Sequence, residues 1–213
     1  MADQLKFYIN GEWVDPLSSE TIEVINPSDE SVIGSISAGT KEDIDIAVRA
    51  AKEAFKTFAF SSKEERIELI ERIISEYEKR SEELAKTISS EMGKPFKDAL
   101  TELDDLSEYL EYYSELARDQ VGRVVAPVEK KSMSLVRYEP YGVVGCIIPW
   151  NYPLSLMGWK LAPALSAGNT IIMKPSEVTS LSLLHWVDIV KEIMPPGVIN
   201  VVTGYGAEAG EEI

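Results

Sequence analysis

Apolar residues recur at steps of three and four over most of the first 120 positions, a pattern typical of amphipathic helices. The pattern predicts helices over about 41–58, from about 62 to 92 with a break near 81, and over about 97–119. Thr40, with Asp43 three residues later, has the spacing of a helix N-terminal cap, and Gly93 followed by Pro95 is a typical helix end. Helices therefore dominate the first half of the chain.

Short apolar runs outside these helices predict strands. Residues 7–14 and 20–25 are expected to form strands around the turn at Asp15-Pro16. Between the last of these helices and Tyr141, two further strands are expected, joined through 127–131 into a hairpin that spans 122–138. An isolated hairpin is marginal in water and its edges can pair with another chain, although it can also pack on its own domain.

From Gly142 onward, apolar runs alternate with helical spacing. The pattern predicts strands 143–148, 170–174 and 198–203, helices 154–166 and 179–193, and a further helix after Gly210. This alternation indicates βαβ units and a parallel sheet. Because two and a half such units do not complete a doubly wound sheet, we expect the chain to be a fragment or a product cut short. The expected division is 1–121, 122–138 and 139–213.

Charge and composition exclude several classes of protein. Thirty-six acidic and 21 basic residues give a net charge of -15, so binding to nucleic acid or to an anionic membrane is not expected. No apolar run approaches about 18 residues, the length of a membrane span. Residues 1–4 lack a signal pattern, which favours a cytoplasmic location.

Few of the titratable residues are expected to carry chemistry. The single cysteine, Cys146, lies in a strand expected to be buried and is interpreted as a core residue, and His185 as a packed or surface residue. The acidic run from Glu102 to Glu108 is interpreted as a solvated helix face, and no metal site is expected there.

Asn151 is the strongest candidate for a catalytic side chain. It lies in the stretch Pro149–Pro153, between an expected strand and an expected helix, where ligands sit in α/β sheets. Its amide can donate a hydrogen bond to an oxyanion. Capping of the following helix is an equally weighted alternative.

Lys174, Ser176 and Glu177 are candidates for binding a cofactor, since they follow the strand 170–174. A carboxylate at a strand end can accept both ribose hydroxyls, the lysine can approach a hydroxyl or phosphate, and Ser176 can donate to a phosphate. Like-charge repulsion between Glu177 and a 2′-phosphate favours NAD over NADP. A surface Lys–Glu pair is the alternative.

Several motifs in one order together resemble the aldehyde dehydrogenase superfamily, and the likeness extends from about residue 7 to the end of the chain. The stretches that carry it are 8–13, 26–27, 91–95, 142–145, 149–153, 159–165, 167–169, 173–177 and 195–202. The resemblance implies an α/β fold with an incomplete Rossmann-like parallel sheet, preceded by an α-helical segment and by an oligomerisation hairpin at 122–138. It also implies the N-terminal portion of an enzyme that oxidises an aldehyde to a carboxylic acid with NAD.

The resemblance carries roles to particular residues. It makes Asn151 the oxyanion donor, and it gives Lys160 a charge-relay role, for which a snorkelling side chain is the alternative. Gly206 and Gly210 would line the adenosine side of the cofactor, although glycines at this spacing are a weak signal alone. The backbone at positions Ile147, Ile148, Pro149 and Trp150 would line the same cleft.

The same resemblance places the nucleophilic cysteine and the general-base glutamate beyond residue 213. We therefore keep two further hypotheses open: a natural truncation that acts as a non-catalytic oligomerisation partner, and a nucleotide-binding module. The aldehyde, the choice between dimer and tetramer, and any role of potassium do not follow from the sequence.

Overall fold

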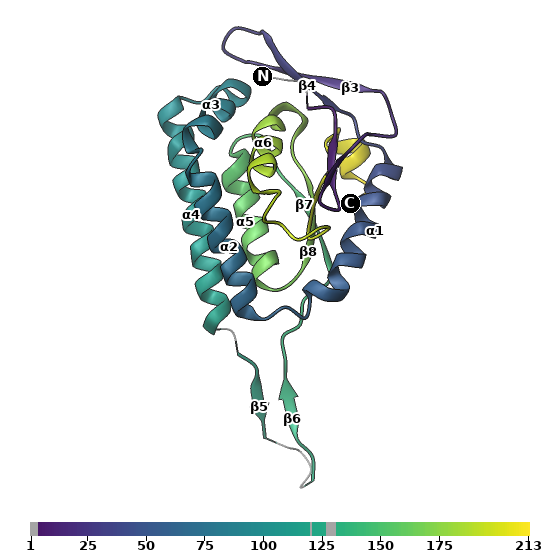
Figure 1. Cartoon of the computed structure of the whole chain (residues 1–213), viewed down its shortest axis with the longest axis vertical. Helices are drawn as coiled ribbons and strands as arrows, with labels where there is room; N and C mark the ends of the chain where they lie inside the picture. The colour runs from purple at the N-terminus through teal and green to yellow at the C-terminus, as the bar shows by residue number, and fades with distance from the viewer. Residues whose placement is uncertain (1–3, 120, 127–130) are drawn as a thin grey trace.

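The computed structural model of the chain describes residues 4–119, 121–126 and 131–213. Its centre is a five-stranded sheet in the order β2-β1-β9-β8-β7, of which β7 and β8 are labelled in Figure 1. Strands β7 (Val143–Ile147), β8 (Thr170–Lys174) and β9 (Ile199–Val201) pair in parallel. The hairpin of β1 (Phe7–Ile9) and β2 (Glu12–Val14) extends the sheet beyond β9 in antiparallel register. The α/β class and the parallel arrangement predicted from the sequence are confirmed.

Helices cover both faces of this sheet (Figure 1). Helix α1 (Lys41–Phe58) packs on one face, and α5 (Pro153–Ser166) and α6 (Leu181–Val190) lie on the other. An outer layer of α2 (Lys63–Glu78), α3 (Ser81–Met92) and α4 (Phe96–Asp119) packs against α5 and α6. The larger hydrophobic core lies between the sheet, α5, α6 and this outer layer, and a smaller one lies under α1.

A glycine allows the outer layer to approach the inner one closely. A Cβ added to Gly158 of α5 would lie 2.5 Å from Cδ1 of Leu106 in α4. Real Cβ atoms do not approach other atoms so closely, so the contact depends on the missing side chain. As a result, side chains of α4 can reach the N-terminus of α5.

The predicted helix ends agree well with the structure. Thr40 and Asp43 form a reciprocal capping box at the start of α1. Gly93 ends α3 with a φ of 85°, the left-handed conformation that a glycine tolerates best.

Near the N-terminus one prediction is wrong and one strand was missed. Residues 7–14 form a hairpin rather than one strand, because Asn10 and Gly11 have φ values of 55° and 85°, the positive angles of a tight hairpin turn. Strand β4 (Val32–Ser37) was not predicted; it pairs with β3 (Thr21–Ile25) in a separate two-stranded sheet.

The C-terminal elements are shorter than expected. Instead of the predicted helix 179–193, a 3-10 turn over Glu177–Thr179 precedes helix α6, which begins at Leu181 and ends at Val190. The predicted strand 198–203 is reduced to β9. Instead of a helix after Gly210, the chain forms one π-helical turn over Gly206–Gly210. Glycines at both ends of so short a segment provide little propensity for a regular helix.

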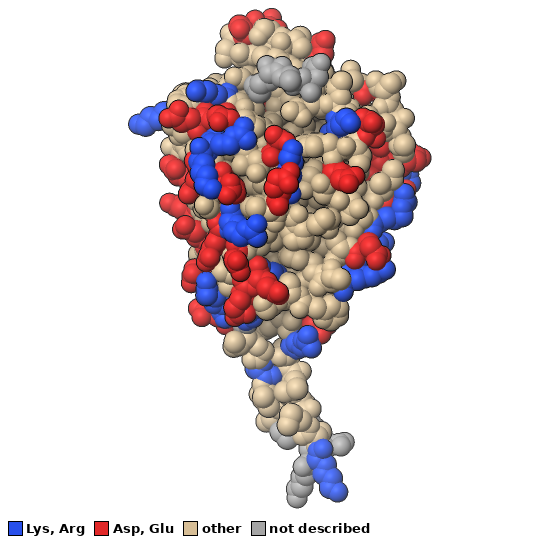
Figure 2. Space-filling view, viewed as in Figure 1, with Lys and Arg blue, Asp and Glu red and all other residues tan. Residues whose placement is uncertain are grey.

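The predicted hairpin is confirmed for the described residues; the connection 127–130 lies outside them. Strands β5 (Arg123–Val125) and β6 (Ser134–Val136) pair in antiparallel register and project from the body of the molecule (Figure 1). Charged side chains gather over the helical body in the view of Figure 2, whereas most of the described part of the hairpin is tan, without charge. Within the described ranges, no helix is long and apolar enough to cross a membrane.

Candidate functional site

The carboxyl ends of the three parallel strands bring three loops together. The Ile148 N–H after β7 donates to the Lys174 carbonyl of β8 over 2.9 Å. The Lys174 ammonium donates to the carbonyls of Pro175 and Gly204, each over 2.7 Å, so it ties the end of β8 to the loop after β9. Segments that are far apart in the sequence thus meet at the edge of the sheet where α/β proteins bind ligands.

Lys174 is a buried cation, which rules out the alternative of a surface Lys–Glu pair. The residue is 2% exposed, and burial lowers the pKa of its ammonium, opposed by the charge of Glu177. The Glu177 carboxylate lies 3.8 Å from Lys174 Nζ and is 33% exposed. An ammonium has three protons, and two of them are used by the carbonyls of Pro175 and Gly204. The third proton is left without a carbonyl acceptor, and the partly exposed Glu177 carboxylate beside it can meet a ligand.

The two candidate glycines differ in their surroundings. Gly206 is exposed, and a Cβ added there would meet nothing within 4 Å. Gly210 is buried, and its added Cβ would lie 3.4 Å from Cδ of Lys174. The structure thus gives Gly210 a packing role beside Lys174, whereas Gly206 leaves open space at the surface.

The residues at the end of β7 and directly after it differ in exposure. Ile147 and Trp150 are 50% and 56% exposed, and Pro149 is also exposed. Ile148 is 1% exposed and its N–H already donates to the Lys174 carbonyl, so this residue supports the strand end from below. Ser176, at the start of the 3-10 turn, is partly exposed, and its carbonyl accepts a hydrogen bond from the Ser180 hydroxyl.

Asn151 is exposed and does not cap α5. The N-cap residue of that helix is Tyr152, whose side chain makes no capping hydrogen bond, and Pro153 follows in the first turn. Within the described residues the Asn151 amide has no hydrogen-bond partner. The capping alternative is therefore wrong, and the amide is free to donate to a ligand.

Glu102 caps α5 in place of Asn151, and the interpretation of this residue as part of a solvated face is wrong. Its side chain is fully buried, and Oε1 accepts from the N–H groups of Leu154 over 2.8 Å and Ser155 over 3.2 Å. Oε2 accepts from the Lys94 ammonium, which is 7% exposed. Position 102 is three residues after Ala99 and four before Leu106, so it lies on the buried face of α4 with these residues and Leu110. This helical spacing was a signal available in the sequence.

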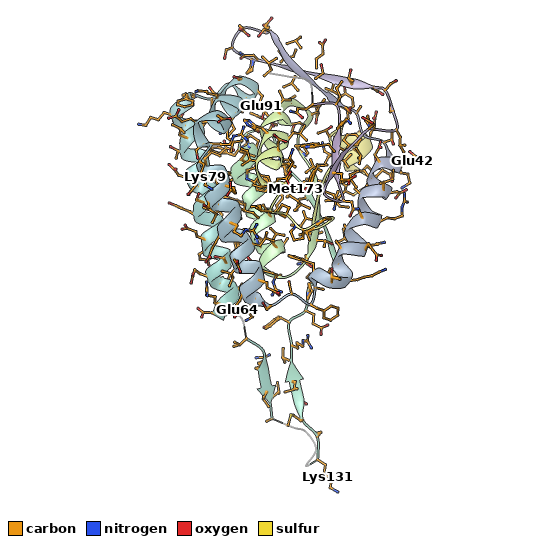
Figure 3. The ribbon with its side chains drawn as sticks, in the orientation of Figure 1. Glu42, Glu64, Lys79, Glu91, Lys131 and Met173 are labelled. Atoms are coloured by element: carbon orange, nitrogen blue, oxygen red, sulfur yellow. The ribbon has the colours of Figure 1, made fainter. Side chains whose placement is uncertain are left out.

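Glu91, which is labelled in Figure 3, makes a similar cap for α6. Its carboxylate accepts from the N–H groups of Leu181 over 2.7 Å and Ser182 over 3.0 Å. Burial raises the pKa of Glu91 to about 7, while its hydrogen bonds oppose the shift. Both buried glutamates therefore come from the outer layer, and each binds the start of a helix that follows one loop of the site.

Lys160 and Cys146 lie close enough to interact electrostatically. Burial raises the pKa of the Cys146 thiol to about 11, and the charge of Lys160 acts against this shift. Cys146 is 1% exposed, in agreement with a core role. Lys160 is partly exposed, and its ammonium lies 3.5 Å from the Leu156 carbonyl. This geometry leaves both the relay and the snorkelling hypotheses open.

His185 packs between helices rather than at the site. Its Nδ1 lies 3.1 Å from the Thr87 hydroxyl, its Nε2 lies 3.3 Å from a guanidinium nitrogen of Arg80, and burial lowers its pKa. Among the described residues, no three His, Cys, Asp or Glu side chains are grouped so as to hold a metal ion.

The structure defines an α/β protein with a Rossmann-like sheet and a candidate ligand site at its strand ends. The model of the aldehyde dehydrogenase family matches residues 13–213, and this chain belongs to that family. The resemblance inferred from the sequence is confirmed.

Similar proteins include plant enzymes. The chain is 41% identical to the chloroplastic aminoaldehyde dehydrogenase ALDH10A8 of Arabidopsis thaliana, over 96% of the chain and 43% of that protein. It is 44% identical to the peroxisomal aminoaldehyde dehydrogenase 2 of Pisum sativum, over 96% of the chain and 42% of that protein. The chain thus spans less than half the length of these relatives.

Solved structures agree with this assignment. The betaine aldehyde dehydrogenase of Staphylococcus aureus in complex with NAD+ superimposes with a TM-score of 0.94 at 34% identity, over 98% of this chain and 42% of that chain. An aldehyde dehydrogenase of Bartonella henselae gives a TM-score of 0.91 at 40% identity, over 99% of this chain and 44% of that chain.

Proposed function

We propose that this chain forms the cofactor-binding part of an enzyme that oxidises an aldehyde to a carboxylic acid, with NAD as the hydride acceptor. The observation that carries the proposal is the meeting of the Asn151 loop with Lys174 and Glu177 at one edge of a parallel sheet, in a member of the aldehyde dehydrogenase family. The solved relative from Staphylococcus aureus, which binds NAD+, supports the choice of cofactor.

The residues at this edge fit a dinucleotide. The partly exposed Glu177 carboxylate can accept hydrogen bonds from both hydroxyls of a ribose, and Lys174 retains one ammonium proton beside it. Ser176 can donate to a phosphate, and the open space at Gly206 permits close approach of a ligand. Because Glu177 would repel a 2′-phosphate, NAD is preferred over NADP.

In this proposal Asn151 stabilises negative charge on the aldehyde oxygen. Its exposed, unpartnered amide can donate without breaking an existing hydrogen bond. Cys146 is not the nucleophile, because it is buried and its thiolate is strongly disfavoured. The thiolate and the general base would be supplied by another part of the complete protein.

Replacement of Asn151 tests this role. In the complete enzyme, Asn151→Ala should lower the single-turnover rate of aldehyde oxidation by about 10²–10³-fold while NAD affinity stays nearly constant. Asn26→Ala, which removes an amide in a distant turn, is the matched control. An unchanged single-turnover rate in Asn151→Ala would assign no oxyanion role to this residue. A complete protein without cofactor-dependent oxidation over a broad aldehyde panel would refute the function itself.

We further propose that the substrate is an aldehyde that carries an amino or ammonium group. Tyr109, Tyr112, Tyr113, Trp159 and Glu108 line a cavity of about 510 Å³ between α4 and α5. The Tyr109 and Trp159 rings meet edge to face at 5.4 Å. Aromatic faces next to a carboxylate favour a cation, and several curated relatives are named aminoaldehyde or betaine aldehyde dehydrogenases.

A comparison of two substrates tests this choice. In the complete enzyme, Trp159→Ala should raise the KM of a trimethylammonium aldehyde by roughly tenfold, and that of an uncharged aldehyde of equal size much less, because only the cation gains from the ring. Val178→Ala, another exposed apolar position, is the control. Equal KM changes for both aldehydes would contradict a cation site at Trp159.

The 122–138 hairpin is proposed as a subunit contact that makes the complete enzyme a homo-oligomer. Val124 and Leu135 face each other across the two strands and are 73% and 66% exposed. At the base of the hairpin, a cavity of about 590 Å³ is lined by Tyr113, Leu116 and Tyr138, among others. Exposed apolar surface of this kind is typical of an interface.

The alternatives of a non-catalytic oligomerisation partner and of a nucleotide-binding module make a different prediction. Either would be favoured if the native gene yields a product of 23.7 kDa, the mass of this chain. A product of at least about twice that mass, with aldehyde dehydrogenase activity, would support the enzyme. The cytoplasmic location also stays a prediction, which fractionation of cells that express the complete protein would test.

A further inference from the structure

Helix α5 begins directly after the loop that carries Asn151, but its cap comes from a different layer of the protein. Tyr152 occupies the N-cap position without a side-chain cap. Instead, Oε1 of Glu102 in α4 accepts from the backbone N–H groups of Leu154 and Ser155. The first N–H groups of a helix lack intrahelical partners and carry partial positive charge, so a buried carboxylate is well suited to this position.

The second oxygen of Glu102 connects this cap to the loop through a cation. Oε2 accepts from the Lys94 ammonium, which also lies 3.7 Å from the centroid of the Tyr152 ring. Lys94 follows Gly93, the left-handed residue that ends α3. The Tyr152 ring and the backbone of Leu154 and Ser155, on either side of Pro153, are thus held by one buried ion pair.

We propose that Glu102 and Lys94 act as a positioning pair, which fixes the Pro149–Pro153 loop and thereby the direction of the Asn151 amide. The inference rests on the proposed function, because Asn151 is there the oxyanion donor. Neither member of the pair is placed at the reacting atoms, so neither is a catalytic residue. An oxyanion donor is effective only when it is held in place before the reaction, and a displacement of about 1 Å can cost up to a hundredfold in rate.

Glu91 offers a matched comparison. It is also a buried glutamate of the outer layer, and it also accepts from two N–H groups at a helix start, those of Leu181 and Ser182. That helix is α6, which follows Lys174 and Glu177 rather than Asn151. General destabilisation caused by the loss of a buried carboxylate should therefore be similar in both variants, whereas an effect on Asn151 should occur in only one.

The variant Glu102→Gln separates the two contacts of the pair. A glutamine oxygen can still accept from Leu154 and Ser155, but its amide nitrogen would then face the Lys94 ammonium, donor against donor. In the complete enzyme, we expect Glu102→Gln to lower the single-turnover rate by about tenfold to a hundredfold, with NAD affinity changed less than about twofold. At saturating NAD, where any loss of cofactor affinity is compensated, Glu91→Gln should leave the single-turnover rate within about threefold of the parent rate.

The partner residue provides the second arm. Lys94→Met removes the ammonium and keeps most of the aliphatic stem, so it should lower the same rate constant. Because the two residues act as one unit, the double variant should be about as slow as the slower single variant. Multiplicative losses in the double variant, or equal losses in Glu102→Gln and Glu91→Gln, would overturn the proposal.

Amide hydrogen exchange tests the positioning pair independently of the proposed enzymatic function. Glu102→Gln should accelerate exchange in the segment 149–156 and leave 178–184 unchanged, whereas Glu91→Gln should do the reverse. This readout needs no turnover, so it decides the positioning claim even if the complete protein oxidises no aldehyde. Unchanged exchange over 149–156 in Glu102→Gln would show that the pair does not hold the loop.

Discussion

Glu91 links the stability of the fold to pH. Burial raises the pKa of this carboxyl to about 7, from 4.5 in the unfolded chain. Between these two values the folded state binds more protons than the unfolded state, so the free energy of unfolding falls as pH rises. The stabilisation of the fold by protonated Glu91 is therefore complete below about pH 4.5 and is lost as pH rises through about 7.

Replacement of Glu91 isolates this effect. Glu91→Gln cannot ionise, so the unfolding free energy of the parent protein relative to this variant should fall by about 1–3 kcal/mol between pH 5 and 8. Denaturant unfolding of the complete protein at several pH values measures the difference. Glu64→Gln makes the same substitution at an exposed position (Figure 3) and is the control for the loss of a carboxylate as such. A constant difference for Glu91→Gln would mean that this carboxyl does not titrate abnormally.

Glu177 should determine the preference between the two nicotinamide cofactors. Glu177→Gln keeps the shape of the side chain and removes the charge that repels a 2′-phosphate, so NAD affinity should fall by about tenfold while NADP affinity falls less or rises. Calorimetry on the complete enzyme with both cofactors measures the ratio. Glu208→Gln changes the same charge on the nearby π-helical turn and should leave the ratio unaltered. Equal losses for NAD and NADP would show that Glu177 does not read the 2′ position.

At the scale of elements, the capping box of α1 should contribute measurably to stability. Thr40→Ala removes a hydroxyl that accepts from the Asp43 N–H and should lower the free energy of unfolding by about 1 kcal/mol. Thr57→Ala makes the same change in the last turn of this helix, where the exposed hydroxyl donates to the Ala54 carbonyl. Its effect should stay within about 0.5 kcal/mol. Denaturant unfolding that gives equal changes would contradict a special role of the cap.

Elements with a local signal were predictable from the sequence, and those without one were not. The start of α1 follows from Thr40 and the end of α3 from Gly93, because each of these residues caps its helix through contacts with sequence neighbours only. The β1–β2 turn also had a local signal, the Asn10-Gly11 pair, which was overlooked in favour of Asp15-Pro16. The addition of this hairpin to the edge of the parallel sheet depends on the distant β9, which no local pattern reveals.

The candidate site shows the same division. Its loops were predicted from the positions of strand ends, which follow from the alternation of apolar runs. The burial of Lys174 was not predicted, because its second carbonyl partner comes from Gly204, 30 residues away. Glu102 was misassigned because a carboxylate is seldom buried; its burial depends on Lys94 and on the free N–H groups of α5, which are brought together only by tertiary packing.

At the scale of the whole molecule, the outer helical layer does more than cover the core. Glu91 and Glu102 cross from this layer to the starts of α6 and α5, so the two loops of the site are held from outside the sheet. The close approach at Gly158 makes the second of these contacts possible. The hairpin, in contrast, projects away from the body and leaves its apolar side chains without cover from the described part of the chain.

This uncovered hairpin leads to a prediction about assembly. If β5 and β6 contact a second subunit, Leu135→Asp places a charge in the interface and should weaken association more than tenfold, since burial of an unpaired charge costs about 2 kcal/mol or more. Sedimentation of the complete enzyme over a range of concentrations measures the shift to smaller species. Val32→Asp introduces the same charge at another exposed strand position, 53% exposed on β4, and should not change the assembly. If both variants keep the parent mass at every concentration, the hairpin is not the contact; if both dissociate, added charge alone explains the loss. Dissociation of Leu135→Asp alone would assign subunit contact to the hairpin, because the two substitutions differ only in the surface that they alter.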